Sequence, residues 1–285
     1  MSSFPIGDLV RCILPFRRNG EVVLMLQAFF DDSGTHGDSG VVVWGGIVGS
    51  IPQIQMLERA WDLMLSEPLP GKSKLSKFGL SDCKNRKGEF VDYNYGESDA
   101  LRYRAREIIQ QSGVKCIAYA VPIVLYNTII RGRVRRDFGE PDGLAFASCA
   151  DFAIQVSQNF NGAPLACIFD KGRSFKSEML YIQDAEKRAN ALGVAVSYAF
   201  AAVSDSYGLQ AADTVATEHY WYGIDCLSTD EPEIKPHFKS LIDMTEPSSF
   251  TLSAANLHEL RRKYYKMYPI RKWVKDRLHR KLLPW

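Results

Sequence analysis

Two apolar, strand-like runs in this chain end abruptly in aspartate. Residues 26–30 lead into Asp31 and Asp32 and then into a Ser-Gly-Thr turn, and residues 168–169 lead into Asp170. An ionised carboxylate at the end of a buried strand is costly unless a partner neutralises it. A divalent cation is one such partner, and a polar turn that simply ends the strand is the common alternative. The pattern predicts a sheet whose strand ends face a polar site.

The order of the remaining segments predicts an α/β fold. Two strands come first and are expected to form a hairpin, one helix follows, and strands then alternate with helices. This order favours a mixed sheet with helices on its faces. Residues 67–96 are expected to be mostly loop, and Ser98 is expected to cap the helix that follows. The predicted strands and helices are strands 21–30, 40–48, 114–121, 164–169 and 194–200, and helices 52–66, 98–111, 144–160, 174–192 and 209–222.

Charge is distributed unevenly along the chain. Residues 258–285 contain ten Lys or Arg side chains against two acidic ones, although the whole chain carries a formal charge of only +2. We therefore predict an α/β domain over residues 1–225 and a helical, basic appendage over residues 226–285. A basic segment on an otherwise acidic chain suggests a polyanionic partner. A basic helix with an apolar stripe is predicted over residues 270–278.

A third acidic position lies within a predicted helix. Asp213 stands in an apolar stretch flanked by small residues, where aspartate has poor helix propensity. Small neighbours allow a helix to approach a sheet closely, which would bring Asp213 to the strand ends, where ligands of α/β sheets gather. Together with Asp31, Asp32 and Asp170 it predicts an oxygen-ligand cluster for Mg²⁺ or Mn²⁺. Because successive strand residues face opposite ways, at most one of Asp31 and Asp32 is expected to be a direct ligand.

Four segments, in order, resemble one known family. They are Phe30-Asp31-Asp32-Ser33-Gly34-Thr35-His36, Lys77-Phe78-Gly79-Leu80-Ser81-Asp82, Ile168-Phe169-Asp170 and Gly208-Leu209-Gln210-Ala211-Ala212-Asp213. The chain resembles the ribonuclease H-like family known as domain of unknown function 3800 over about residues 24–222. That resemblance implies a ribonuclease H-like fold and metal-dependent nuclease chemistry. Two positions depart from the family pattern: Asp32 stands where Glu is commoner, and Ser81 stands where many relatives have His.

Five further residues are predicted to contact a substrate. Four arginines within residues 131–136 form a basic patch that suits phosphate, although a solvated loop is the ordinary alternative. His36 follows the acidic turn, Lys171 follows Asp170, and Gln210 precedes Asp213 in the helix motif. The candidate substrate contacts are His36, Lys171, Gln210, Arg133 and Arg135, and a solvated side chain is the ordinary alternative for His36 and Lys171.

The leading hypothesis is a metal-dependent nuclease or phosphodiesterase that acts on DNA or RNA. Asp31, Asp32, Asp170 and Asp213 would serve as its catalytic and metal-binding residues. One alternative is a non-catalytic module that binds nucleic acid or protein on the same fold, and another is a phosphotransferase of the sugar-kinase and actin type. The six cysteines show no metal-site or paired spacing and no apolar run is long enough to span a bilayer, so a cytoplasmic protein without membrane partners is expected.

Overall fold

Six strands form one mixed sheet in this computed structural model. The structure describes residues 25–35, 39–171, 175–228, 238, 241 and 250–267. Within these residues the strand order is β5-β4-β1-β2-β3-β6, in which β6 is only two residues long. The strands are β1 (Leu26–Ser33), β2 (Val41–Ser50), β3 (Lys115–Pro122), β4 (Leu165–Asp170), β5 (Val196–Ala201) and β6 (Phe250–Thr251).

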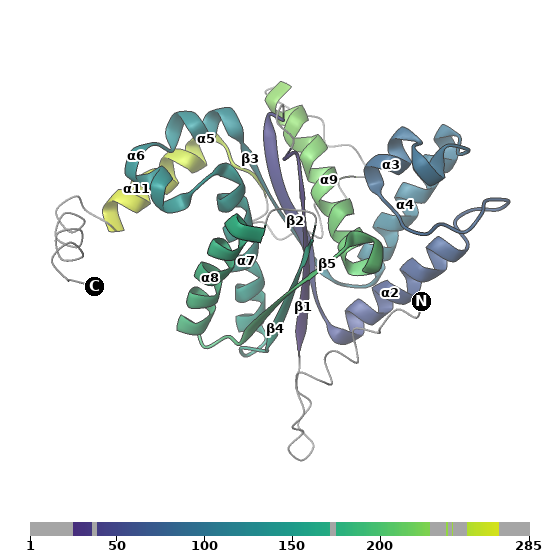
Figure 1. The fold of residues 1–285 in the computed structure, drawn as a ribbon, viewed down its shortest axis with the longest axis horizontal. Helices are drawn as coiled ribbons and strands as arrows, with labels where there is room; N and C mark the ends of the chain where they lie inside the picture. The colour runs from purple at the N-terminus through teal and green to yellow at the C-terminus, as the bar shows by residue number, and fades with distance from the viewer. Residues whose placement is uncertain are drawn as a thin grey trace, which may run out of the picture.

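The sheet combines antiparallel and parallel pairs. β2 runs antiparallel to both of its neighbours, β1 and β3, while β4 pairs in parallel with β1 and β5 in parallel with β4. The carboxyl ends of β1, β3, β4 and β5 therefore lie at one edge of the sheet (Figure 1). The predicted α/β class, with helices flanking a mixed sheet, is confirmed.

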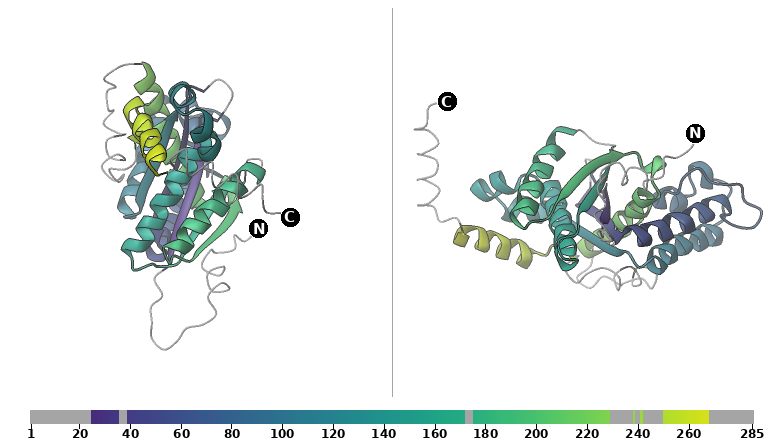
Figure 2. Two further views of the ribbon diagram at one scale, coloured as in Figure 1. Left: turned by 90° about the vertical axis from the view of Figure 1, so that its left-hand side faces the viewer. Right: turned by 90° about the horizontal axis from the view of Figure 1, so that it is seen from below.

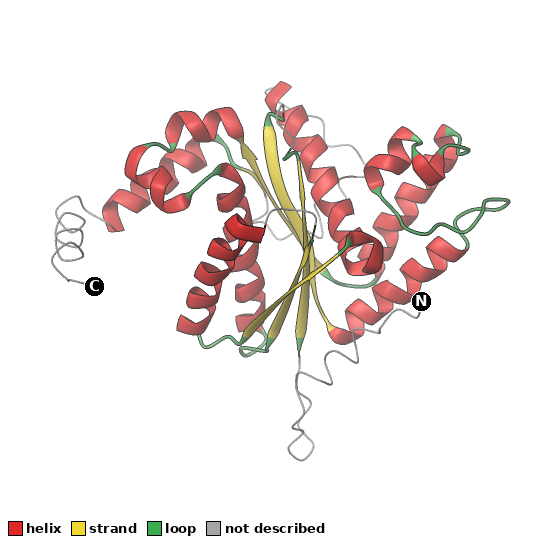
Figure 3. Cartoon of the chain, viewed as in Figure 1, coloured by secondary structure: helices red, strands yellow, loops and turns green. Residues whose placement is uncertain are grey.

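Helices cover both faces of the sheet (Figures 1 and 3). On one face α9 lies directly on β1 and β2, with α2, α3 and α4 packed around it. On the other face lie α7 and α8, and α5, α6 and α11 extend this layer beyond β3, as the turned views of Figure 2 also show. The helices are α2 (Ile51–Ser66), α3 (Leu80–Asn85), α4 (Tyr95–Gln111), α5 (Ile123–Ile129), α6 (Gly132–Phe138), α7 (Pro141–Asn159), α8 (Phe175–Ala191), α9 (Tyr207–Ser228) and α11 (Ala254–Met267).

Two hydrophobic cores lie on the two sides of the sheet. We call them the α9-side core, which includes Phe29, Trp61 and Leu209, and the α7-side core, which includes Phe30 and Phe146. Phe29 and Phe30 are neighbours in β1 yet belong to different cores, because side chains alternate across a strand. This alternation decides which side of the sheet each residue of β1 reaches.

Two local features differ from the sequence-based expectation. β1 continues through Asp31 and Asp32 to Ser33, because backbone pairing with β2 persists along that stretch, so the acids lie within the strand and the turn starts later. The helix expected to start at Ser98 starts at Tyr95, since Asn94 and Glu97 form a capping box. Ser98 is instead a buried residue of the first turns.

The C-terminal part of the described chain is attached to the same body. α9 runs to Ser228 and so crosses the predicted boundary between residues 225 and 226. β6 pairs with β3, and α11 packs on α5. The basic helix predicted over residues 270–278 lies outside the described residues.

Candidate functional site

β1 sends its two acids to opposite sides of the sheet. Asp31 lies opposite Gly45 of β2, and the residues of β1 alternate between the two cores. Asp31 therefore shares the α9 side with Phe29, whereas Asp32 shares the α7 side with Phe30. Asp31 is buried, with 7% of its surface exposed. Of the two acids, Asp31 on the α9 side is the more buried.

Asp32 stands in a more polar setting. It is half-buried, and its Oδ2 accepts a hydrogen bond from the Thr35 hydroxyl at 2.8 Å. Its partner across the pair is Trp44, whose indole Nε1 donates to Asp142 at 2.6 Å. Asp32 thus lies near the end of β1, and a residue of the turn that follows the strand holds it.

The second predicted strand-end acid lies next to Asp31. β1 and β4 pair in parallel up to Phe30 and Phe169, so Asp31 and Asp170 occupy neighbouring positions one residue further on. Asp170 follows Ile168 on the same side of β4, and Ile168 belongs to the α9-side core. The carboxyl ends of two adjacent parallel strands therefore place two carboxylates on one side of the sheet.

Helix α9 approaches this side of the sheet very closely. A Cβ added to Gly45 would lie 2.7 Å from the backbone Cα of Ala216, and one added to Gly208 would lie 2.6 Å from the Phe29 ring. Only hydrogen fits at these two contacts, so helix and sheet touch through their backbones. The predicted close approach is confirmed, and it sets Asp213, between Gly208 and Ala216 on α9, over β1.

Backbone and hydroxyl donors hold the carboxylate of Asp213. Its Oδ2 accepts a hydrogen bond from the backbone N–H of Leu80 at 3.3 Å, and its Oδ1 accepts one from the Thr217 hydroxyl at 3.2 Å. Leu80 is the first residue of α3, so this contact also links α3 to α9. Both donors favour the ionised form of the carboxyl group.

The acids act on one another electrostatically. The pKa of Asp31 is raised to about 8, mostly by burial and then by the charges of Asp213, Asp32 and Asp170, while the hydrogen bond from the Asp32 backbone N–H lowers it. The pKa of Asp213 is raised to about 6, mostly by burial, with a smaller rise from the charges of Asp82 and Asp170 and a lowering by the hydrogen bonds described above. All four acids predicted from the sequence therefore belong to one electrostatic cluster. We call Asp31, Asp32, Asp82, Asp170 and Asp213 the acidic cluster.

Asp82 is a member that was not predicted as a site residue. It lies exposed on α3, in the loop segment that the family resemblance singled out. Its charge acts on Asp213 because the hydrogen bond between Leu80 and Asp213 fixes α3 against α9. The family resemblance pointed to the segment that contains Asp82. The sequence pattern did not show that this segment packs against α9 beside Asp213.

A divalent cation suits the chemistry of this cluster. The charged groups that shift the pKa of Asp31 and Asp213 are all carboxylates, so the cluster gathers negative charge. Carboxylate oxygens are the ligands that Mg²⁺ and Mn²⁺ prefer. Across the part of the chain that the structure describes, however, no group of three or more His, Cys, Asp or Glu side chains is already arranged to hold a metal ion. The chemistry of the donor set fits a hard cation.

Gln210 lies one helical turn before Asp213 and is completely buried. Its Oε1 accepts hydrogen bonds from Trp61 Nε1 at 3.0 Å and from the backbone N–H of Phe78 at 2.9 Å. Its Nε2 donates to the carbonyl of Val203 at 3.2 Å. These bonds tie α9 to α2, to the loop before α3 and to the segment after β5. The geometry gives Gln210 a positioning role, and its contact with a substrate stays a prediction.

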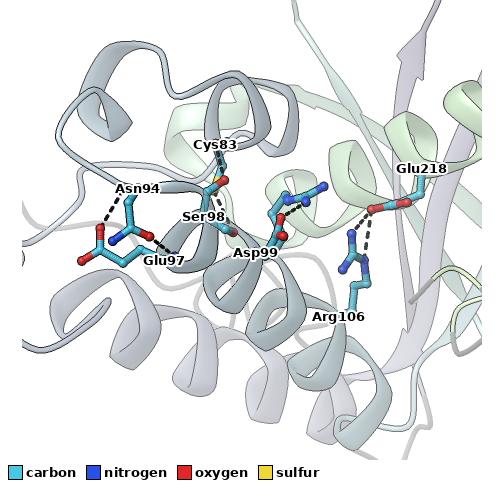
Figure 4. A network of polar contacts seen from close by, with 8 residues as sticks. Cys83, Asn94, Glu97, Ser98, Asp99, Arg106 and Glu218 are labelled. Carbon is cyan, nitrogen blue, oxygen red and sulfur yellow. Dashed lines mark hydrogen bonds and ion pairs between the residues drawn. The ribbon is translucent and has the colours of Figure 1, made fainter. Parts of the chain in front are cut away.

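A buried ion pair holds the middle of α9 (Figure 4). Arg106 of α4 donates from Nε to Glu218 Oε1 at 3.0 Å and pairs with the same oxygen through its Nη2. Both side chains are buried. α4 is itself fastened to α3, because the Ser98 hydroxyl donates to the carbonyl of Cys83 at 2.6 Å (Figure 4). The helices that surround Asp213 thus form one connected polar framework.

Two predicted substrate contacts lie on the other side of the sheet. Arg133 and Arg135 belong to α6, whose Val134 is part of the α7-side core. Arg133 donates to the Tyr264 hydroxyl at 3.1 Å, and Arg135 pairs with Glu140. The structure does not bring these arginines into the acidic cluster.

The structure describes only one of the last two predicted substrate contacts. Lys171 is exposed directly after Asp170, and its backbone N–H donates to the carbonyl of Ala201 at 2.9 Å. Its position beside the cluster leaves it accessible to an anion. His36 lies outside the described residues.

Comparison with known proteins adds no family to this description. No protein-family model matches the chain. No curated protein matches it at a significant level.

Among the described residues, no helix combines the length and the apolar character needed to cross a membrane.

Proposed function

We propose that this protein is a metal-dependent nuclease or phosphodiesterase that acts on nucleic acid through a carboxylate-bound Mg²⁺ or Mn²⁺. One observation carries the proposal: Asp31 of β1, Asp170 of β4 and Asp213 of α9 share the α9 side of the sheet and act on one another electrostatically. Strongly perturbed carboxyl groups that gather at one place are typical of functional sites. Such a group is stabilised most directly by a bound cation.

We also propose that the fold is ribonuclease H-like. Three consecutive antiparallel strands, β1 to β3, are continued beyond β1 by the parallel strands β4 and β5. Asp31 and Asp170 of this resemblance lie near the carboxyl ends of the neighbouring strands β1 and β4, and Asp213 lies on helix α9, which packs over β1. This topology and the position of the acids support the family resemblance found in the sequence.

Asp31, Asp170 and Asp213 would hold the metal, with Asp32 and Asp82 adding negative charge nearby. A bound Mg²⁺ or Mn²⁺ supplies an activated water and neutralises charge on a phosphodiester oxygen. Leu80 and Thr217 orient the carboxylate of Asp213 and keep it ionised through their hydrogen bonds. Asp31 holds a proton near neutral pH until a positive charge replaces it, because its pKa is about 8.

Calorimetric titration with Mn²⁺ tests the metal site. The wild type is expected to bind Mn²⁺, and Asp31→Asn and Asp170→Asn are expected to bind it at least tenfold more weakly, since each removes one anionic ligand. Asp92→Asn, which neutralises an exposed acid outside the cluster, serves as the matched control and should bind as the wild type does. Equal affinity in all four proteins would refute the site.

Incubation with labelled DNA and RNA in Mn²⁺ tests the reaction. Cleavage by the wild type and by Asp92→Asn, but not by Asp31→Asn or Asp170→Asn, is the expected outcome. Binding of nucleic acid without cleavage would instead favour the non-catalytic module. Hydrolysis of ATP without cleavage would favour the phosphotransferase.

We further propose a cytoplasmic protein. Cys83, Cys116, Cys149 and Cys167 are buried free thiols, and burial raises the pKa of Cys116 to about 12. Unpaired, unreactive cysteines in a core suit a reducing compartment.

A further inference from the structure

Helices α6 and α11 lie side by side although about 120 residues separate them in the chain. Arg133 of α6 donates to the Tyr264 hydroxyl of α11, and the Phe138 and Tyr264 rings lie 5.8 Å apart. Tyr264 also donates a hydrogen bond to Asp137 of α6. These contacts, made through the buried Tyr264, fix α11 against α6, and we call the solvent-facing part of the two helices the α6–α11 surface.

Basic side chains dominate this surface. The helix α6 region contributes four arginines, which are Arg131, Arg133, Arg135 and Arg136. Helix α11 contributes four basic residues, all of them exposed, which are Arg261, Arg262, Lys263 and Lys266. The acids among them are Asp137, Glu140 and Glu259, so positive charge is in excess. A concentration of this kind attracts a polyanion.

An aromatic ring is placed among these charges. Tyr265 of α11 is 36% exposed, and the guanidinium carbon of Arg133 lies 5.7 Å from the centre of its ring. The same guanidinium lies 5.1 Å from the ring of Tyr264, to which it is also hydrogen-bonded. Arg133 is thereby held between two tyrosines, one of which offers part of its ring to solvent. An exposed ring within a basic surface is the arrangement on which unpaired bases stack.

The apolar side of α11 is already occupied. Leu257 and Tyr264 are buried in the α7-side core, and Leu260 packs against the same core. An amphipathic helix that binds a membrane surface needs an exposed apolar face to insert among the lipids. The side of α11 that faces solvent is basic and polar except for Tyr265. A nucleic-acid backbone therefore fits this surface better than a lipid surface does.

The topology relates this surface to the acidic cluster. β1 and β3 both run antiparallel to β2, so their carboxyl ends lie at the same edge of the sheet. α5 and α6 follow β3 at that edge, and Asp31 and Asp170 lie near the ends of β1 and β4 at the same edge. The surface thus begins at the strand-end edge that also carries the acids, although it packs on the opposite side of the sheet.

We propose that the α6–α11 surface binds the backbone of single-stranded nucleic acid, with Tyr265 as a stacking platform for a base. Such binding would anchor a substrate strand near the acidic cluster, and this use of the surface rests on the proposed function. The binding itself needs no metal and no cleavage.

Fluorescence anisotropy with labelled oligo-dT and oligo-U, in EDTA and over a series of salt concentrations, tests the proposal on the full chain. Arg261→Gln/Lys266→Gln should weaken binding and lower the slope of log Kd against log salt by about 1.4, since each phosphate contact on a single strand contributes about 0.7. Tyr265→Leu should weaken binding roughly tenfold and leave the slope unchanged, because it removes stacking and no charge. Lys74→Gln/Lys87→Gln removes two exposed positive charges elsewhere and is the matched control.

Three results would overturn the proposal. They are equal losses in the control and in Arg261→Gln/Lys266→Gln, wild-type affinity in both surface variants, and binding to phosphatidylserine vesicles in place of oligonucleotides. Asp31→Asn separates this proposal from the proposed function. It should bind oligonucleotides in EDTA as the wild type does while losing cleavage in Mn²⁺. If the wild type binds through α6 and α11 but cleaves nothing, the proposed function fails and the binding surface stands.

Discussion

The two sides of the sheet differ in how their charged side chains are arranged. On the α9 side, Asp31 is buried beside Asp170 and Asp213, and the charges that shift its pKa are carboxylates. On the α7 side, the arginines of α6 have partners of complementary chemistry, such as Tyr264 for Arg133 and Glu140 for Arg135. The α9 side buries carboxylates beside one another, whereas the α7 side pairs individual arginines at a surface that keeps an excess of positive charge.

The difference follows from how closely the helices approach. α9 touches β2 through Gly45 and Ala216, which leaves no space for a long cationic side chain between helix and sheet. α6 and α11 lie beyond the sheet edge, where arginine side chains have room to extend over tyrosine rings. A site that breaks the ordinary rule for buried charge, inside a fold that otherwise obeys it, is typical of function. Substitutions on the two sides of the sheet test this contrast.

The largest effect is expected from the one buried ion pair described on the α9 side. Arg106→Met leaves Glu218 buried without its partner and should lower the free energy of unfolding by about 3–5 kcal/mol. Urea denaturation followed by circular dichroism measures the change. Arg106→Met/Glu218→Met removes both charges and should recover most of the loss. A double variant no more stable than the single one would mean that the pair acts through packing.

The acidic cluster should make the metal-free protein less stable as pH rises. The folded-state pKa of Asp31 is about 8 and that of Asp213 about 6, both above the ordinary value of 3.8, so the folded state binds more protons than the unfolded state between these values. The contribution to stability is full below about pH 4 and is lost as pH rises towards 8.

Urea denaturation in EDTA between pH 5 and pH 8 checks this slope. Asp31→Asn cannot ionise, so it should remove most of the decline that occurs above pH 6. Millimolar Mg²⁺ or Mn²⁺ should raise the stability of the wild type more at pH 8 than at pH 5. A wild type whose stability rises over this range would contradict the proposed coupling of the acids.

Contact between α9 and the sheet should depend on a glycine. Gly45→Ala places a methyl group 2.7 Å from the Ala216 backbone, so α9 must move, and we expect a loss of about 1–3 kcal/mol. Displacement of α9 should also weaken Mn²⁺ binding, since Asp213 moves with it. Gly96→Ala in α4 has its nearest contact at 3.4 Å and is the matched control, expected to keep wild-type stability and affinity.

The sequence predicted those parts of the site that depend on local pattern. Apolar runs that end in acids located Asp31 and Asp170, and the parallel pairing of β1 and β4 then sets them side by side. The small residues around Asp213 indicated a close approach of its helix to the sheet, which Ala216 makes against Gly45. These features follow from alternation and side-chain size, which a single segment already contains.

Features that depend on contacts between distant segments could not be predicted from such local patterns. Asp82 joins the cluster only because α3 is bonded to α9 through Leu80, and Arg106 meets Glu218 across 112 positions of the chain. The helix start at Tyr95 is a different case. Asn94 and Glu97 have the spacing of a capping box, so the signal was present in the sequence and outweighs Ser98 as a cap.

The smallest effect on stability is expected from a substitution on the α6–α11 surface. Glu259 of α11 is exposed, and its pairing with Arg262 lowers its pKa. Glu259→Gln breaks this ion pair but should leave the urea midpoint unchanged within error, because exposed ion pairs are screened by water and salt. The same variant removes an acid from the α6–α11 surface, so it should bind oligo-dT more tightly at low salt and lose that gain at high salt. If Glu259→Gln instead destabilised the protein as strongly as Arg106→Met does, the two sides of the sheet would not differ in how they hold charge.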